Sequence, residues 1–283
     1  MTPPSSDDAL FLPDRDRVVP TEFARGPWTA NALHGGPVAA LLARAVESCP
    51  TDEPMHVARL TVDLLRPVPI TPLSVSAVVS RPGRKVQVVE ARVSDGDRDL
   101  AWGRALRIRL DTPGSDPNSD GPDSRGPDSL GRGLVPGTDP DAPPGPDGGY
   151  KSAEPMGGYR AFHSAGAELR FVMGQFAARG PATVWVRLAV PVVPGEEPTP
   201  LQRVAAAADF GNGVSSELDF GDYLFINPDL TVYLHRPAIG EWVCIDSSTR
   251  IGVPGVGLAQ CALWDVHGPL GRSLQSLLVE RRG

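Results

Sequence analysis

Two stretches of this chain, LTVDLLRPVP (residues 60–69) and LTVYLHRPAI (residues 230–239), are identical at six of ten positions. A second echo follows each of them, GRALR at residues 103–107 and GRSLQ at residues 271–275. Internal similarity at one spacing marks a repeated unit, and a unit of more than a hundred residues is too long for a solenoid. The 283-residue chain is therefore predicted to be a tandem duplication of one domain.

Each copy predicts one helix followed by four strands. In the first copy, GGP (residues 35–37) precedes VAALLARAVES, with Pro37 expected at the first helical position. This helix is apolar around most of its circumference, so it must be enclosed. In the second copy, Thr199 as cap and Pro200 as first residue begin a helix to about Asp209, and residues 211–213 are expected to end it with a left-handed cap.

Runs rich in β-branched residues, separated by Arg-Pro, Pro-Gly and Asp-Gly turns, predict the strands. They cover residues 55–65, 73–80, 85–93 and 100–110 in the first copy, and residues 167–176, 183–193, 224–235, 242–251, 257–265 and 271–281 in the second. The expected fold class is α+β, with an antiparallel sheet wrapped around a central buried helix in each half.

Composition sets the domain boundaries. Residues 1–20, rich in Pro, Asp and Arg, predict a flexible N-terminal arm, and residues 21–110 form the first domain, with a first strand expected over residues 21–30. Residues 111–150 contain eight Asp, two Arg and almost no aliphatic side chains, so they cannot offset the entropy of ordering. They predict a disordered linker before the second domain, residues 151–283.

Bulk properties exclude several classes of function. The formal net charge is -7, of which the predicted linker accounts for -6, so the rest of the chain lacks the basic surface that a nucleic-acid partner requires. The three cysteines have no metal-ligand spacing and indicate reduced thiols in a cytoplasmic protein. No export signal or membrane span is expected, and no motif for a metal, a cofactor or a G-x-S-x-G nucleophile occurs.

Four motifs carry a resemblance: HGGP (residues 34–37), DLTVYLHRP (229–237), GEW (240–242) and GRSLQSLLVERR (271–282). Over roughly residues 20–110 and 160–283, the chain resembles the type II acyl-CoA thioesterases and their actinobacterial-type relatives. The resemblance implies a tandem, or double, hotdog fold and a hydrolase of lipid metabolism that acts on acyl-CoA. It implies no cofactor, because coenzyme A is part of the substrate, and it allows a homo-oligomer.

Asp209 is the first candidate for chemistry. A carboxylate at the end of an otherwise apolar helix is disfavoured by the helix dipole, so stability does not explain its position. The alternative is that Asp209 binds backbone groups of the following glycine turn. Burial is expected to raise its pKa and to give a base that works near neutrality.

The resemblance implies that Asp209, Asn227 and Gln275 together hold the attacking water. The family has Thr at the position of Asn227, and an Asn amide can still orient a water molecule. In the first half, the counterpart of Gln275 is taken to be Arg107, and the helix there ends in Glu47. A single active site per chain, with the base in the second half, is therefore predicted.

His34, Gly35 and Gly36 are the candidate substrate-binding residues. Free amides at a helix N-terminus attract the negative charge that develops on a thioester carbonyl, and glycine permits close approach. The alternative is that the glycines only permit a tight entry to the helix, and His34 is expected to pack or hydrogen-bond rather than act as base.

The predicted function is acyl-CoA hydrolysis. The alternative is a non-catalytic hotdog protein that binds acyl-CoA or another acyl ligand. A hotdog dehydratase is disfavoured, because no His has an Asp five positions before it.

Overall fold

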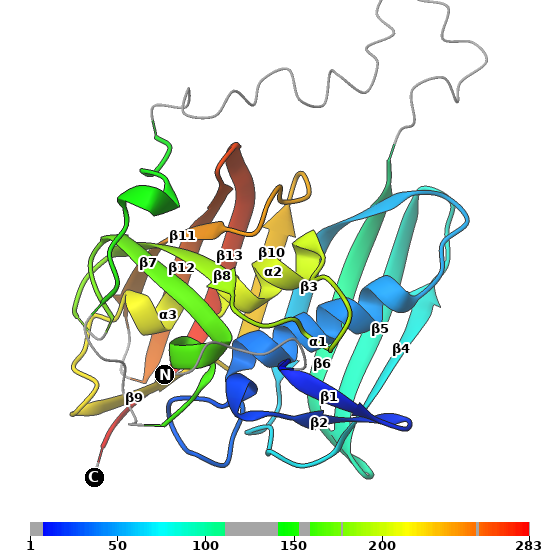
Figure 1. Ribbon diagram of the computed structural model, residues 1–283, viewed down its shortest axis with the longest axis horizontal. Coiled ribbons are helices and arrows are strands. Elements are labelled where there is room, and N and C mark those ends of the chain that lie inside the picture. The colour runs from blue at the N-terminus through cyan, green and yellow to red at the C-terminus, as the bar shows by residue number, and fades with distance from the viewer. Residues whose placement is uncertain (1–7, 111–140, 153–158, 177, 253–254, 283) are drawn as a thin grey trace, which may run out of the picture.

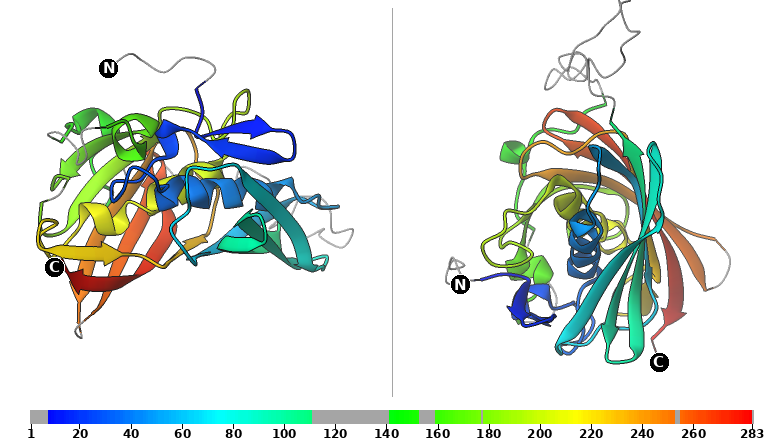
Figure 2. Two further views of the ribbon diagram at one scale, coloured as in Figure 1. Left: turned by 90° about the horizontal axis from the view of Figure 1, so that it is seen from below. Right: turned by 90° about the vertical axis from the view of Figure 1, so that its right-hand side faces the viewer.

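The computed structural model describes residues 8–110, 141–152, 159–176, 178–252 and 255–282. Residues 1–7 of the predicted arm and residues 111–140 of the predicted linker lie outside the described residues. In the described part, one continuous antiparallel sheet of thirteen strands curves around two helices that lie side by side (Figures 1 and 2). This arrangement confirms the predicted fold class.

The first half consists of a hairpin, a short 3₁₀ turn, a helix and four strands. Their bounds are β1 Phe11–Asp14, β2 Arg17–Pro20, η1 Glu22–Ala24, α1 Gly35–Ser48, β3 Met55–Leu64, β4 Leu73–Arg81, β5 Val86–Asp95 and β6 Arg98–Arg109.

The second half repeats this order after two short helical turns, and it adds one further short helix and one further short strand. The bounds are η3 Pro146–Gly148, η4 Phe162–Gly166 (a π-helical turn), β7 Ala167–Met173, β8 Ala182–Leu188, α2 Pro200–Ala208, α3 Gly211–Val214, β9 Tyr223–Ile226, β10 Asp229–Leu234, β11 Val243–Ile251, β12 Val256–Asp265 and β13 Gly268–Arg281.

The strand order is a palindrome: β1-β2-β4-β5-β6-β3 is followed by β10-β13-β12-β11-β8-β7, and the thirteenth strand, β9, pairs with β13 outside this order. The repeated strands β3 and β10 pair with each other at the centre, where Thr61 lies opposite Thr231 and their hydroxyl oxygens are 3.3 Å apart. These two residues occupy the same position of the repeat. Only a two-fold axis places equivalent residues opposite each other in an antiparallel pair, so the duplication folds as a pseudo-symmetric dimer within one chain.

The two helices run antiparallel inside the sheet. α1 is buried along nearly its whole length, and α2 is rich in alanine, which lets the two backbones approach closely. A Cβ on Gly36 would lie 2.6 Å from the carbonyl oxygen of Ala206. Burial of each Leu or Val contributes roughly 1.5–3 kcal/mol, and the two halves share one core around the helices.

The N-terminal segment differs from the prediction. Residues 11–20 form the hairpin β1–β2, which joins the sheet next to β4, and Ala9, Leu10 and Phe11 are fully buried. A flexible arm is therefore wrong for this part, because its few apolar residues are placed together and fill the core. The strand expected over residues 21–30 is also replaced, by a 3₁₀ turn capped by Thr21.

Both predicted helix caps at glycines need correction. α1 begins at Gly35 with His34 as its cap, so Pro37 is its third residue and not its first. α2 begins with Thr199 and Pro200 as predicted, but Gly211 has no positive φ and instead begins α3. Gly211 is required for space, because a Cβ there would lie 2.7 Å from the Cys261 sulfur and 2.8 Å from Gln275 Oε1.

Strand pairing also corrects the alignment of the two copies. Thr61 lies opposite Arg104, whereas Thr231 lies opposite Leu274, so the counterpart of Gln275 is Ala105 and not Arg107. The GRALR and GRSLQ echo is out of register by two residues, which preserves the face of the sheet. Both ladders carry a bulge at the corresponding place, just before the repeated glycine region.

The end of the predicted linker packs on the second half instead of remaining free. The Trp185 indole donates to the carbonyl of Pro144 at 2.7 Å, and Tyr150 pairs with Phe171.

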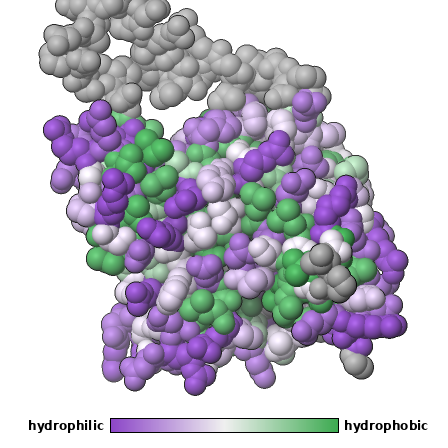
Figure 3. Space-filling model, turned by 180° about the vertical axis from the view of Figure 1, so that it is seen from behind, coloured by the Kyte–Doolittle hydropathy of each residue, from purple (hydrophilic) through white to green (hydrophobic). Residues whose placement is uncertain are grey.

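Among the described residues, no helix is long and apolar enough to cross a membrane. The face opposite to Figure 1 shows apolar residues in separate clusters among hydrophilic ones (Figure 3).

Candidate functional site

The first turn of α1 and the last turn of α2 meet at a cavity of about 310 Å³. Its wall is mostly apolar, and its polar groups are few. The residues around the helix ends that line it are His34, Gly35, Val38, Asp209, Phe210, Asn212 and Asn227. A concave apolar pocket with a few convergent polar groups is the usual form of a ligand site.

Asp209 is the capping residue at the C-terminal end of α2 and is 4% exposed. The antiparallel packing of the helices places its carboxylate against the N-terminus of α1, where a Cβ on Gly35 would lie 2.7 Å from both carboxylate oxygens. The unfavourable dipole of its own helix is therefore opposed by the favourable one of α1. The position of Asp209 is unfavourable when α2 is considered alone, and the contact of its carboxylate with the start of α1 explains it.

Four donors surround the Asp209 carboxylate. Asn227 Nδ2 donates to Oδ1 at 2.9 Å and Gln275 Nε2 donates at 3.3 Å, while His34 Nδ1 lies 2.8 Å from Oδ2. The amide of Gly36 also bonds to this carboxylate. Burial would raise the pKa of Asp209, but the bonds from His34, Asn227 and Gly36 outweigh it and hold the pKa below its ordinary value. The predicted upward shift is therefore wrong.

His34 caps α1 and packs against the rings of Phe162 and Phe210, which also stack on each other with centroids 5.2 Å apart. The ring centroids of Phe162 and Phe210 lie 5.1 and 4.8 Å from that of His34. Because an ionised carboxylate only accepts, the close contact with Asp209 requires the proton on His34 Nδ1. The Gly36 amide points at the same nitrogen, 3.1 Å away, but a protonated Nδ1 cannot accept, so this amide is left to the Asp209 carboxylate. Of the two glycine amides expected to be free, that of Gly36 is therefore occupied.

Asn227 reaches Asp209 because its strand is interrupted. The strand expected over residues 224–235 is divided into β9 and β10 at Asn227 and Pro228, and proline has no N–H to continue a ladder. The corresponding position of the first half, near Ala58, is a bulge in β3. The repeated strand therefore bends at the same place in both copies, and in the second copy the bend turns a polar side chain toward the cavity.

Gln275 lies behind Asp209. It is 1% exposed, it is not part of the described cavity wall, and its Oε1 accepts from the amide of Asn212 at 3.1 Å. The structure therefore brings Asp209, Asn227 and His34 together at the cavity, and it places Gln275 as a support that fixes the carboxylate from the far side.

Gly211→Ala is expected to displace Gln275, since the new Cβ would lie 2.8 Å from Gln275 Oε1. A misplacement near 1 Å reduces turnover by roughly ten-fold to a hundred-fold, and kcat for thioester hydrolysis measures it. Gly252→Ala, directly after β11, is the control, because nothing lies within 4 Å of its Cβ and it is not part of the described cavity wall. Equal kcat for both variants would show that Gln275 does not fix the site.

The other ends of the two helices form a second, symmetry-related contact. Glu47 near the end of α1 accepts from the Thr199 hydroxyl at 2.7 Å and from Gln202 Nε2 at 3.2 Å. A cavity of about 250 Å³ adjoins them. Burial raises the pKa of Glu47 against these bonds. Pro200 lies at the start of α2, where Gly35 lies at the start of α1, and proline has no backbone N–H. The contact at Glu47 therefore lacks the backbone donor that the start of α1 offers beside Asp209. One active site per chain remains a prediction.

Several residues of the site carry no signal in the sequence. Phe162 and Phe210 pack against His34, Asn212 donates to Gln275, and Cys261 bounds the space at Gly211. Only Phe210, which directly follows Asp209, was adjacent to a candidate. Among the described residues, no group of His, Cys, Asp and Glu is arranged to hold a metal ion.

Comparisons with known proteins identify the family and the fold of the chain. Models of the N-terminal and the C-terminal domain of acyl-CoA thioesterase match residues 24–109 and 136–279. No curated protein matches the chain.

Three solved structures share the fold over nearly all of both chains. A proposed thioesterase II from Thermobifida fusca YX has a TM-score of 0.67 at 18% identity and covers 99% of each chain. A conserved protein with a hot dog fold from Alicyclobacillus acidocaldarius has a TM-score of 0.65 at 15% identity and covers 98% of each. The acyl-CoA thioesterase II TesB2 from Mycobacterium marinum has a TM-score of 0.60 at 14% identity, covering 90% of this chain and 93% of that one. With two family models on its two halves, and the double hotdog fold throughout, the chain belongs to the acyl-CoA thioesterase family that these two domain models describe.

Proposed function

We propose that this protein hydrolyses an acyl-CoA thioester to the free acid and coenzyme A, with Asp209 as the base. The observation that supports this most is the position of Asp209, a buried carboxylate that faces both the cavity and the N-terminus of α1. Asn227 shares the cavity wall and orients the water, while Gln275 and His34 fix the carboxylate. The small volume of the cavity, about 310 Å³, favours an acyl group of modest size.

In the proposed reaction, a water in the cavity attacks the thioester carbonyl and gives one proton to Asp209. The oxyanion that forms is stabilised at the start of α1, where the first amides of a helix have no acceptor within the helix. Gly35 is the candidate donor, since the Gly36 amide is bonded to Asp209. Collapse of the intermediate breaks the C–S bond, and the proton passes to the departing thiolate.

Non-catalytic binding of acyl-CoA is the second candidate. The observation that favours it is the saturation of the Asp209 carboxylate by four donors, which lowers its pKa and its strength as a base. With its lowered pKa, the Asp209 carboxylate remains ionised, and it takes up a proton only once the water has begun to bond to the thioester carbonyl carbon.

Release of free thiol from a panel of acyl-CoAs separates the two candidates. Hydrolysis predicts turnover above the spontaneous rate for at least one chain length. Binding without any turnover, measured by calorimetry on the same panel, would favour the second candidate and contradict the first.

The pH dependence of stability tests the state of Asp209. Because its pKa is lowered in the folded protein, its ionisation adds stability that is present above the unfolded value, about 4, and is lost as the pH falls through the folded value. The difference in unfolding free energy between wild type and Asp209→Asn should therefore stay constant from about pH 8 to 5 and shrink below about pH 4. A difference that instead changes in favour of the wild type as the pH falls from about 7 to 5 would indicate a raised pKa.

A further inference from the structure

The Arg-Pro pair of the repeat has different partners in the two halves. In the second half, Arg236 forms a two-pronged salt bridge to Asp265, with bonds of 2.6 and 2.8 Å, and donates to the carbonyls of Gly268 and Pro269. The Asp265 side chain is fully buried, and Arg236 is 12% exposed. All of the donors on this guanidinium serve the fold.

The register of the two copies makes Arg66 and Asp95 the counterparts of Arg236 and Asp265. Arg66 keeps one equivalent bond, from Nε to the carbonyl of Asp99 at 3.4 Å, but no ion pair joins it to Asp95 among the residues that the structure describes. Both side chains are exposed.

The sequence gives a reason for this difference. In the second half, the amide of Ile239 donates to Asp265 at 2.8 Å and helps to hold it against Arg236. The corresponding residue of the first half is Pro69, which has no N–H. The first copy has therefore lost a bond that keeps the carboxylate in place, and its arginine is left facing solvent.

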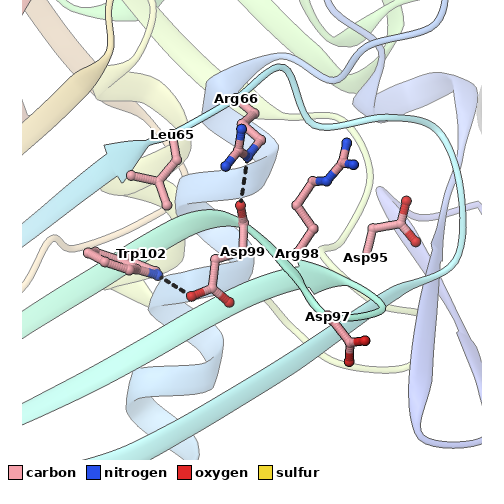
Figure 4. A pocket seen from close by; sticks show the side chains of 7 residues that line it. All are labelled: Leu65, Arg66, Asp95, Asp97, Arg98, Asp99 and Trp102. Atoms are coloured by element: carbon pink, nitrogen blue, oxygen red, sulfur yellow. Dashed lines mark hydrogen bonds between the residues drawn. The ribbon is translucent and has the colours of Figure 1, made fainter.

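Arg66 and Asp95 both line a cleft of about 830 Å³ beside the candidate site (Figure 4). Leu65 and Arg66 belong both to this cleft and to the wall of the cavity that contains Asp209. The remaining lining residues come from the turn between β5 and β6 and from Trp102. A long ligand with its reactive end at Asp209 and its other end in solvent would pass Arg66.

We propose that Arg66 and this cleft bind the phosphate groups of coenzyme A, so that Arg66 determines specificity for the thiol part of the substrate. The inference rests on the proposed function. A guanidinium with free donors matches the geometry of phosphate oxygens, and it stands where the chain of the substrate leaves the cavity.

Two arginines and three aspartates line the cleft, so the surroundings of each carboxylate decide whether it opposes a bound phosphate. Asp99 accepts from the Trp102 indole at 2.9 Å and lies 3.6 Å from Arg92, so it is partly neutralised. Figure 4 shows Asp97 pointing away from the two guanidinium groups, while Arg66 and Arg98 extend on the same side of the turn. Asp95, the counterpart of the carboxylate that binds Arg236, is then the carboxylate that we expect to compete with a phosphate for Arg66.

The test compares two substrates with the same acyl group, acyl-CoA and the S-acyl-N-acetylcysteamine thioester, which has no phosphate. Arg66→Met should raise KM for acyl-CoA on the order of ten-fold and leave kcat unchanged. Asp95→Asn should lower that KM, because it removes the competing charge. Neither variant should change the kinetics of the short thioester. Added salt should raise KM for acyl-CoA more in the wild type than in Arg66→Met.

The control is Arg104→Met, an exposed arginine of β6 whose nearest carboxylate, on Glu90, is 4.0 Å away. It should match the wild type on both substrates. An equal rise in KM for both thioesters in Arg66→Met would overturn the inference and show a structural role. If the wild type hydrolyses neither thioester, the proposed function fails, and calorimetric binding of coenzyme A to wild type and Arg66→Met still decides the inference. Equal affinity there would overturn it.

Discussion

Asp209→Asn should abolish most of the thioesterase activity, with kcat reduced by roughly a hundred-fold to ten thousand-fold. The amide cannot accept the proton of the attacking water. In the wild type, His34, Asn227, Gln275 and Gly36 all donate to the Asp209 carboxylate. In the variant, the new NH₂ group is itself a donor and lies against these donors. Thiol release under substrate saturation measures the loss, and calorimetry with the intact acyl-CoA measures whether binding remains.

Glu47→Gln is the matched control for that variant. Glu47 is the carboxylate at the other pair of helix ends, with Thr199 and Gln202 as donors. Because Pro200 leaves that end without the amide that Gly35 supplies, Glu47→Gln should change kcat by less than about two-fold. A loss comparable to that of Asp209→Asn would contradict the prediction of one active site per chain, and full activity in Asp209→Asn would remove Asp209 from the mechanism.

Arg236→Met should reduce the free energy of unfolding by about 3–5 kcal/mol, because it leaves the fully buried carboxylate of Asp265 without its cation. Urea denaturation at neutral pH measures this change. Burial opposes ionisation of Asp265, but the bonds from Arg236, Ile239 and His267 dominate and lower its pKa. The stability that this carboxylate adds is therefore present above the unfolded pKa, and it is lost as the pH falls through the folded one.

The duplication supplies the comparison for this experiment. Arg66→Met changes the counterpart of Arg236, but Arg66 is exposed and has no carboxylate bound to it in the described part of the chain. Its removal should change the unfolding free energy by less than about 1 kcal/mol. Similar losses in the two variants would show that Arg66 also serves the fold, and they would weaken the assignment of its cleft to a ligand.

Much of the fold was predictable because the two copies constrain each other. The ten-residue repeat located β3 and β10, and the apolar runs located most of the other strands, although β8 ends at Leu188 and not at residue 193 and the run over residues 224–235 is divided. The cap of α2 by Thr199 was readable, since capping is a local interaction. The hairpin β1–β2 was missed because its few apolar residues gain their burial only from parts of the chain that are distant in sequence.

The candidate site was predictable only as a set of residues. Asp209 was singled out by a local conflict with its helix dipole, and the resemblance supplied Asn227 and Gln275. Their arrangement was not predictable: Gln275 supports Asp209 from behind the cavity, and the pKa of Asp209 is lowered instead of raised. The shift depends on donors from α1, on which the sequence of α2 carries no information.

The sequence by itself determined that this protein is a duplication, which strands are repeated, and where the copies differ, as at Pro69 against Ile239. These are properties of neighbouring residues and of their periodicity, which act over short distances along the chain. The tertiary structure alone decided that the end of α2 meets the start of α1, and that Arg66 is open while Arg236 is closed. Both results depend on the two-fold packing of the halves. This packing brings together groups that are far apart in sequence, and it decides which of them are buried with a partner and which face solvent.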